Sequence, residues 1–115
     1  MILPSNNKFP RNNQLRKGND FKEVFNNGYR CHTEHFTILY KNNSYGISRL
    51  GVIVGKGVFA SAVKRNRLKR LVREIYRQNN DLFNSFDIVI KADKKEQTLN
   101  YHSIKKEICE QFRLL

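Results

Sequence analysis

KRNRLKRLVREIYR, residues 64–77, is the stretch that decides how this chain folds. Leu68, Val72 and Ile75 recur at spacings of four and three residues. At about 100° per residue, these side chains share one face of a helix. The spacing predicts a long helix over residues 61–78 whose aliphatic face packs on a sheet.

The side of this helix that faces away from the sheet is basic. Seven of the fourteen residues are Lys or Arg and one is Glu, a net charge of +6 and half of the formal charge of +12. Guanidinium groups can bond two phosphate oxygens at once and can stack on bases, and an Asn can meet a base edge or a 2′-hydroxyl. The residues that point directly away from the core are Asn66, Arg70, Arg73 and Arg77, flanked by Arg65, Arg67 and Lys69. A solvated helix face is the ordinary interpretation of a charge run, but such faces usually mix Glu with Lys. We therefore predict an RNA-binding surface.

Strand patterns lie on both sides of the long helix. Residues 47–54 form one, in which Leu50, Val52 and Val54 point to one face, and residues 86–92 form another. Further out, residues 29–40 alternate as a strand, with Phe36, Ile38 and Tyr40 opposite His35, Thr37 and Leu39.

Two shorter helices complete the pattern. Asn19 or Asp20 can cap a helix that Gly28 ends, and the last helix is expected over residues 101–114. Together these elements predict a single-domain α+β fold, an α/β sandwich with one sheet, in the order helix, strands, helix, strand, helix. Residues 1–17 are expected to be a basic, partly flexible N-terminal arm, and residues 18–115 the RNA-binding domain.

Composition narrows the partner and the compartment. A chain of 115 residues fits one domain, and its charge of +12 repels itself unless a polyanion offsets it. The first twenty residues lack the apolar segment of a secretory signal, so we expect a cytoplasmic protein. Cys31 and Cys109 are expected to be free thiols.

The residue pattern offers no catalytic site or metal site. Two-metal cleavage needs clustered carboxylates, and the ten acids are scattered. A metal-free ribonuclease would need two histidines, but His32 and His35, three apart on a strand, would point to opposite faces. We expect no catalytic residue, no bound cofactor and no metal site in the chain.

Four segments in this order resemble the bacterial ribonuclease P protein component over residues 15–115. The segment RNRLKRLVRE, residues 65–74, is similar to the family's signature helix. The others are LRKGNDFKEVFNNG at residues 15–28, RLGVIVGK at 49–56 and DIVIKA at 87–92.

The resemblance implies a fold and a set of partners. One mainly antiparallel sheet, with the elements in the order α-β-β-β-α-β-α, would contain a left-handed βαβ crossover, which is rare. The partners would be the catalytic RNA subunit of ribonuclease P and the 5′ leader of precursor tRNA, with neither membrane nor DNA, and Mg²⁺ would be held in the RNA holoenzyme. The RNA-subunit contacts would be Arg65, Asn66, Arg67, Lys69, Arg70, Arg73 and Arg77. The leader contacts would be Phe21, Phe25, Thr37, Leu39, Arg49 and Lys56.

Several alternatives stay open. The family often has an aromatic residue where direct register gives Leu39 here, with Tyr40 one step later. The family's paired lysines are here Lys56 and Gly57. Phe21 and Phe25 would ordinarily be core residues. A structural RNA-binding protein of ribosomal type, or a stand-alone ribonuclease that uses His32 or His35, are the competing functions.

Overall fold

The computed structural model describes residues 14–15, 18–83 and 85–113. Its elements follow the predicted order, with one additional short 3₁₀ turn. They are α1 (Gly18–Asn27), β1 (Tyr29–His32), β2 (Phe36–Asn42), β3 (Arg49–Ile53), α2 (Ala62–Gln78), η3 (Asn80–Leu82), β4 (Phe86–Ala92) and α3 (Tyr101–Arg113).

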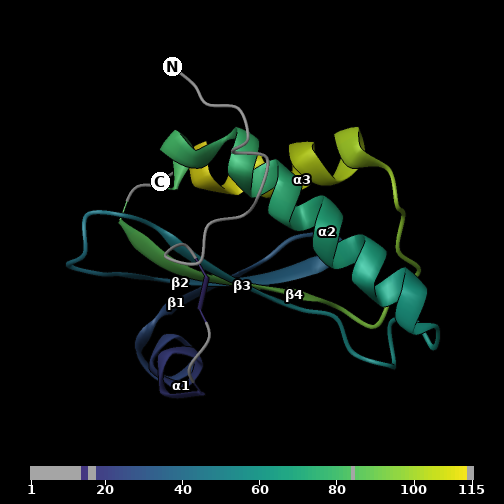
Figure 1. Ribbon diagram of the computed structural model, residues 1–115, viewed down its shortest axis with the longest axis horizontal. Coiled ribbons are helices and arrows are strands. Elements are labelled where there is room, and N and C mark those ends of the chain that lie inside the picture. The colour runs from purple at the N-terminus through teal and green to yellow at the C-terminus, as the bar shows by residue number, and fades with distance from the viewer. Residues whose placement is uncertain (1–13, 16–17, 84, 114–115) are drawn as a thin grey trace.

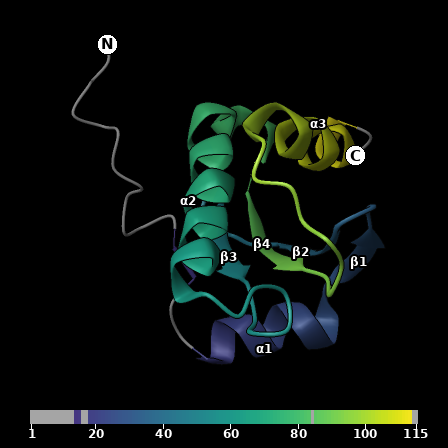
Figure 2. The same cartoon turned by 90° about the vertical axis from the view of Figure 1, so that its right-hand side faces the viewer.

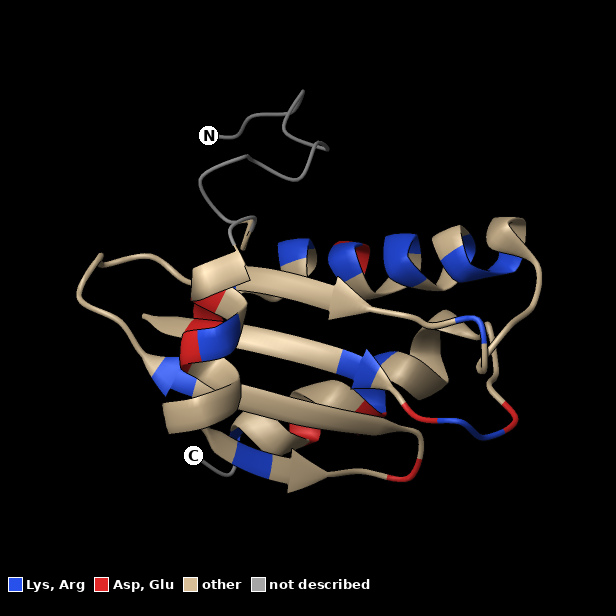
Figure 3. Ribbon diagram, turned by 90° about the horizontal axis from the view of Figure 1, so that it is seen from below, with Lys and Arg blue, Asp and Glu red and all other residues tan. Residues whose placement is uncertain are grey.

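The four strands form one sheet in the order β1-β2-β4-β3. The pairs β1–β2 and β2–β4 are antiparallel, and β3–β4 is parallel. Figure 3 views the sheet from the α1 side: the chain leaves β3, passes behind the sheet as α2 and returns as β4. This path is a left-handed crossover, as expected. Two of the three strand pairs are antiparallel, so the expected mainly antiparallel α+β fold is confirmed.

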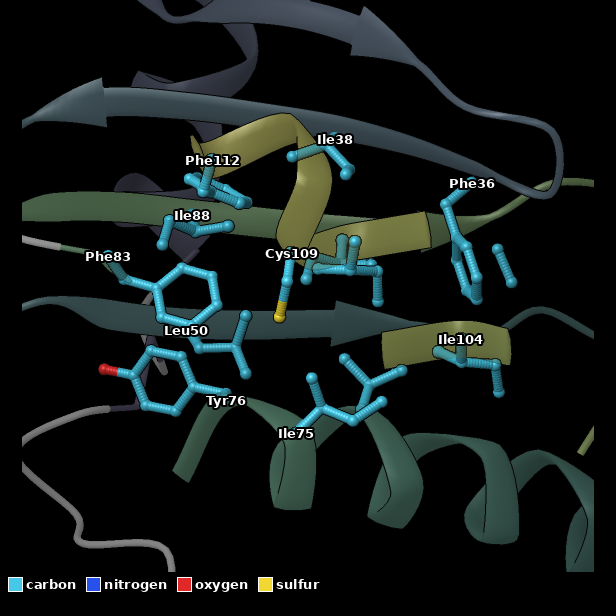
Figure 4. Close-up of a cluster of buried hydrophobic side chains, with 14 of the residues drawn as sticks. Phe36, Ile38, Leu50, Ile75, Tyr76, Phe83, Ile88, Ile104, Cys109 and Phe112 are labelled. Atoms are coloured by element: carbon cyan, nitrogen blue, oxygen red, sulfur yellow. The ribbon is translucent and has the colours of Figure 1, made fainter. Parts of the chain in front are cut away.

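Helices cover both faces of the sheet, as Figures 1 and 2 show. Helices α2 and α3 lie on one face, above the main core, and α1 lies on the other. Figure 4 shows the main core, where Phe36, Ile38 and Leu50 from the strands meet side chains of α2 and α3. A smaller cluster, made of Leu15, Val24, Leu39 and Val89, lies under α1.

Helix α2 forms where the sequence predicts it. The Ser61 side chain accepts a hydrogen bond from the Lys64 amide at 3.3 Å and caps the first turn. Leu68, Val72 and Ile75 are buried, as expected. Tyr76 is buried as well, outside the predicted stripe, because its hydroxyl donates to the Ser48 carbonyl at 3.0 Å and so keeps a polar partner.

The stretch over residues 29–40 is divided into two strands by a turn. Thr33 and His35 interrupt the ladder, with the Thr33 amide bonded to the Phe36 carbonyl at 2.8 Å. The Glu107 carboxylate accepts hydrogen bonds from the His35 amide, at 2.6 Å, and from the Thr33 hydroxyl. This acceptor lies more than seventy residues away, so local periodicity does not reveal the turn.

Part of the predicted N-terminal arm is packed on the domain. The Leu15 amide donates to the Leu50 carbonyl at 3.0 Å, Gln14 pairs with Leu50, and the Leu15 side chain is buried. Residues 1–13 and 16–17 of the arm lie outside the described residues. No helix in the part of the chain that the structure describes has the length and apolar character needed to cross a membrane.

Candidate nucleic-acid interface

The outward side of α2 carries exposed cations that the protein leaves without a counter-charge. Asn66, Arg67, Arg70 and Arg73 are exposed, and none of the three arginines has an ion pair within the described residues. Figure 3 shows basic residues along the length of α2. We call these four residues the α2 basic face.

Three other predicted RNA-contacting residues of α2 are less free. Arg65 donates to the carbonyls of Phe59 and Ala60, both at 2.8 Å, and so holds the turn before the helix. Lys69 is half-buried.

Arg77, expected to point freely outward, is paired with Glu74 on the same helix. The Arg77 Nε lies 3.1 Å from Glu74 Oε1, and Gln78 also donates to this carboxylate. The hydrogen bond from Arg77 holds the pKa of Glu74 below its usual value, and the carboxylate raises the pKa of Arg77. The charge of Arg77 is thus compensated in the free protein.

The sheet face under α1 is arranged as three rows of side chains that cross the strands. The middle row runs through Arg30, Leu39, Val89 and Gly51. Leu39 and Val89 are fully buried, and the Phe21 ring lies so close over Gly51 that a Cβ there would be 2.5 Å from it. Leu39 therefore lies on the α1 face but is not accessible.

Tyr40 lies on the opposite face of the sheet from Leu39. Its ring is stacked with Tyr29, with centroids 5.5 Å apart, and contacts Phe86 and Phe112 edge to face. The direct register therefore holds: Leu39 lies on the α1 face, where it is buried, and the Tyr40 ring lies on the other face.

The row on one side of α1, formed by Lys41, Asp87 and Arg49, is neutralised within the protein; we call it the closed row. Arg49 makes two hydrogen bonds to the Asp87 carboxylate, at 2.8 and 2.7 Å. Asp20 and Glu23 of α1 lie 3.6 Å from Arg49 and Lys41 respectively. The bond to Asp87 raises the pKa of Arg49, so this predicted leader contact already has its charge matched.

The row on the other side of α1 is formed by His32, Thr37, Lys91 and Ile53; we call it the open row. His32 and Lys91 are exposed, and Lys91 has no ion pair among the described residues. Thr37 is 8% exposed and forms the floor. The open row therefore has a basic group without a counter-charge, whereas the basic groups of the closed row are all paired with acids.

Aromatic side chains of α1 border the open row. Around the helix, Glu23 and Phe25 lie about 100° to either side of the buried Val24. Because Glu23 faces the closed row, Phe25 faces the open row, and its side chain is 37% exposed. Phe21 is half-buried on the same side, and Lys56 is exposed in the turn after β3. Phe21, Phe25 and Thr37 therefore lie on the open-row side of α1, and Lys56 follows the end of β3 that belongs to this row. Leu39 is covered, and Arg49 lies in the closed row.

Two members of the open row were not among the predicted contacts. Lys91 is a charged residue that interrupts the apolar pattern of β4. This interruption is visible in the segment DIVIKA and could have indicated an exposed contact. His32 was considered only as a catalytic group, and its position beside Thr37 depends on the β1–β2 register.

The two histidines that were considered for acid–base chemistry lie in separate environments. His32 Nδ1 is 3.0 Å from the Thr37 hydroxyl, whereas His35 Nδ1 is 2.8 Å from Glu107 at the turn. Within the described ranges there is no group of three or more His, Cys, Asp or Glu placed to hold a metal ion.

Comparison with known proteins establishes the family. The sequence model described as Ribonuclease P matches residues 9–114. The chain belongs to the bacterial ribonuclease P protein family. The ribonuclease P protein component of Syntrophus aciditrophicus is 38% identical over 99 residues, covering 85% of this chain and 82% of that protein.

Solved structures of ribonuclease P proteins agree in fold. The protein from Thermotoga maritima is 31% identical, with a TM-score of 0.79 over 89% of this chain and 96% of that one. The protein from Staphylococcus aureus is 23% identical with a TM-score of 0.78, over 89% and 94% of the two chains. A ribonuclease P protein is the accessory subunit of an endoribonuclease, so the family implies an RNA partner in the holoenzyme.

Proposed function

We propose that this chain is the cytoplasmic protein subunit that binds the catalytic RNA of ribonuclease P through α2 and the 5′ leader of precursor tRNA along the open row. The observation that carries the proposal is the contrast between the two sides of α1. The closed row is neutralised by Asp20, Glu23 and Asp87, whereas the open row has an unmatched Lys91 on the side of α1 where Phe25 is exposed.

The α2 basic face suits a folded RNA. Arg67, Arg70 and Arg73 project from a helix whose other face is fixed by the core, so their guanidinium groups are presented on a rigid support. Phosphate contacts of this kind supply sequence-independent affinity, which falls as salt rises. Arg65 and Arg77 also lie on this helix, but their present partners would have to be exchanged for RNA.

The open row suits a single strand. Base stacking on an aromatic ring contributes about 1–3 kcal/mol and tolerates any base. Phe25 offers such a ring, and Lys91 and Lys56 are exposed cations that can lie near leader phosphates. Thr37 and Leu39 form the floor of the site rather than its contacts, and Arg49 is bonded to Asp87 across β3 and β4 in the closed row.

In this mechanism the RNA carries the catalysis. Phosphates of the RNA are proposed to hold Mg²⁺, while the protein reduces backbone repulsion and holds the leader. A substrate with a leader then gains contacts that mature tRNA lacks, which raises affinity for precursor over product.

The decisive experiment compares precursor and mature tRNA binding by the assembled holoenzyme. We expect Phe25→Ala and Lys91→Gln to reduce the preference for precursor several-fold while affinity for the RNA subunit stays unchanged. Lys106→Gln, an equal loss of charge on an exposed site of α3, is the matched control. Equal affinities of the unmodified holoenzyme for both tRNAs would favour a structural RNA-binding protein instead.

A further inference from the structure

A chain of hydrogen bonds runs from the open row to the end of β4. His32 Nδ1 lies 3.0 Å from Thr37 Oγ1, and Thr37 Oγ1 donates to Asp93 Oδ1 at 2.8 Å. His32 and Thr37 are paired across β1 and β2, on either side of the turn between these strands, and Asp93 follows the end of β4. Thr37 is 8% exposed, so the residue in the middle of this chain of hydrogen bonds has little contact with water.

The direction of these bonds fixes the tautomer of the neutral imidazole. A hydroxyl has one proton, and Thr37 uses it in the bond to the Asp93 carboxylate, which can only accept. The Thr37 oxygen must therefore accept from His32, so Nδ1 carries the hydrogen. In the neutral ring the other nitrogen, Nε2, is then an acceptor with a free lone pair.

This acceptor belongs to an exposed side chain next to cations and aromatic surface. Thr37 separates His32 from Lys91 in the open row, and Phe25 borders the same side of α1. Lys91 and Phe25 suit phosphates and base faces, and neither accepts a conventional hydrogen bond. His32 adds the missing capability, recognition of a hydrogen-bond donor on the bound strand.

We propose that His32 is a specificity-determining residue whose Nε2 accepts a hydrogen bond from a donor of the leader, and that Thr37 and Asp93 hold its tautomer for this purpose. The proposal rests on the function proposed above. Donors on a nucleotide are the ribose 2′-hydroxyl and the exocyclic amines of bases. The 2′-hydroxyl suits a site that must accept many leaders, because every ribonucleotide carries it, and it distinguishes RNA from DNA.

The test uses the assembled holoenzyme and precursor tRNAs with a single 2′-deoxy substitution at each leader position in turn, at about pH 8, where imidazole groups are ordinarily neutral. One neutral hydrogen bond corresponds to roughly a two- to tenfold change in affinity. We expect one deoxy position to weaken binding by this factor. In His32→Ala, the all-ribose precursor should bind more weakly by a similar factor, and the same deoxy substitution should have no further effect.

Two further variants serve as controls for the role of His32. His102→Ala removes an exposed histidine of α3 and should retain the full deoxy effect. Thr37→Val keeps the side-chain shape but removes the hydroxyl, so both tautomers become populated and the deoxy effect should shrink without vanishing. Thermal unfolding of each variant checks that the fold is retained.

The outcomes separate this proposal from the function on which it depends. If the unmodified holoenzyme shows no preference for precursor, the proposed function fails. If the preference is present but no deoxy or base substitution interacts with His32→Ala, His32 accepts no bond from the leader and this proposal alone is overturned. An interaction with changes of the base instead of the sugar would assign the donor to an exocyclic amine.

Discussion

Glu107 connects the β1–β2 turn to α3. Its carboxylate accepts from the His35 amide at 2.6 Å, from His35 Nδ1 at 2.8 Å and from the Thr33 hydroxyl. Burial acts to raise the pKa of Glu107, but the bonds from Thr33 and His35 outweigh it, and the pKa lies below its ordinary value of 4.5. The ionised form is therefore the one that stabilises the fold.

Glu107→Gln should lower the free energy of unfolding at pH 7 by about 1–2 kcal/mol, because an acceptor oxygen and its charge are lost. A lowered folded-state pKa gives stability that is present above the ordinary Glu pKa and is lost as pH falls through the folded value. The difference between the two proteins should thus narrow below pH 4.5. Urea unfolding at several pH values measures this difference in stability, and Glu110→Gln, at an exposed position of α3, is the control. A difference that does not vary with pH would contradict this role.

At single residues, the sequence predicted the exposed side chains of α2 better than those of the sheet. Arg70 and Arg73 lie where helical periodicity places them because that periodicity is local. The neutralisation of Arg49 depends on Asp87, thirty-eight residues away, and on the parallel register of β3 with β4. Lys91 and His32 enter one row only once the strand order is known, and no local pattern contains that order.

Among the elements, α1 depends on a close approach at its end. The Gly28 amide donates to the Val24 carbonyl at 2.9 Å, and a Cβ at Gly28 would lie 2.5 Å from that oxygen and 2.8 Å from the Tyr40 carbonyl oxygen. Both atoms belong to backbone and cannot turn away as a side chain would. Only glycine allows the helix to end directly against β2.

Gly28→Ala should therefore destabilise the protein by about 1–3 kcal/mol through overpacking. Because α1 borders the open row, its displacement should also reduce the preference for precursor tRNA. Gly55→Ala is the matched control, since a Cβ there meets nothing within 4 Å, and its effect should be neutral or stabilising by up to about 1 kcal/mol. Chemical denaturation of both variants measures the contrast, and similar losses in the two would argue against the close approach.

Helix α2 contains its own restraint on RNA binding in the pair Arg77–Glu74. Glu74→Gln should free Arg77 and strengthen binding to the RNA subunit, with a salt dependence steeper by about 0.7–0.9 in slope if one phosphate contact is gained. Glu110→Gln changes the net charge equally on α3, outside the α2 basic face. Filter binding over a salt series compares the two variants. Equal effects of Glu74→Gln and Glu110→Gln would mean that net charge alone is responsible.

For the whole molecule, charge and stability oppose one another. The formal charge of +12 is unevenly placed, since the acids of α1 and β4 neutralise the closed row while α2 keeps its cations exposed. Like charges three or four residues apart on a helix destabilise it by about 0.2–0.5 kcal/mol per pair. The exposed cations of α2 therefore lower the stability of the free protein, and they stabilise its complex with a polyanion.

Replacing Arg70 and Arg73 together by Gln should consequently have opposite effects on the two states. The free protein should gain about 0.5–1 kcal/mol in its free energy of unfolding at low salt, because like-charge pairs on α2 are relieved, and the gain should fade as salt screens them. Binding to the RNA subunit should weaken, with the salt slope smaller by about one unit per lost phosphate contact. Lys105→Gln with Lys106→Gln removes the same charge from α3 and should leave the slope nearly unchanged. Thermal unfolding and salt-dependent binding measure the two effects, and a double variant less stable than the parent would show that these guanidinium groups serve the fold rather than the RNA.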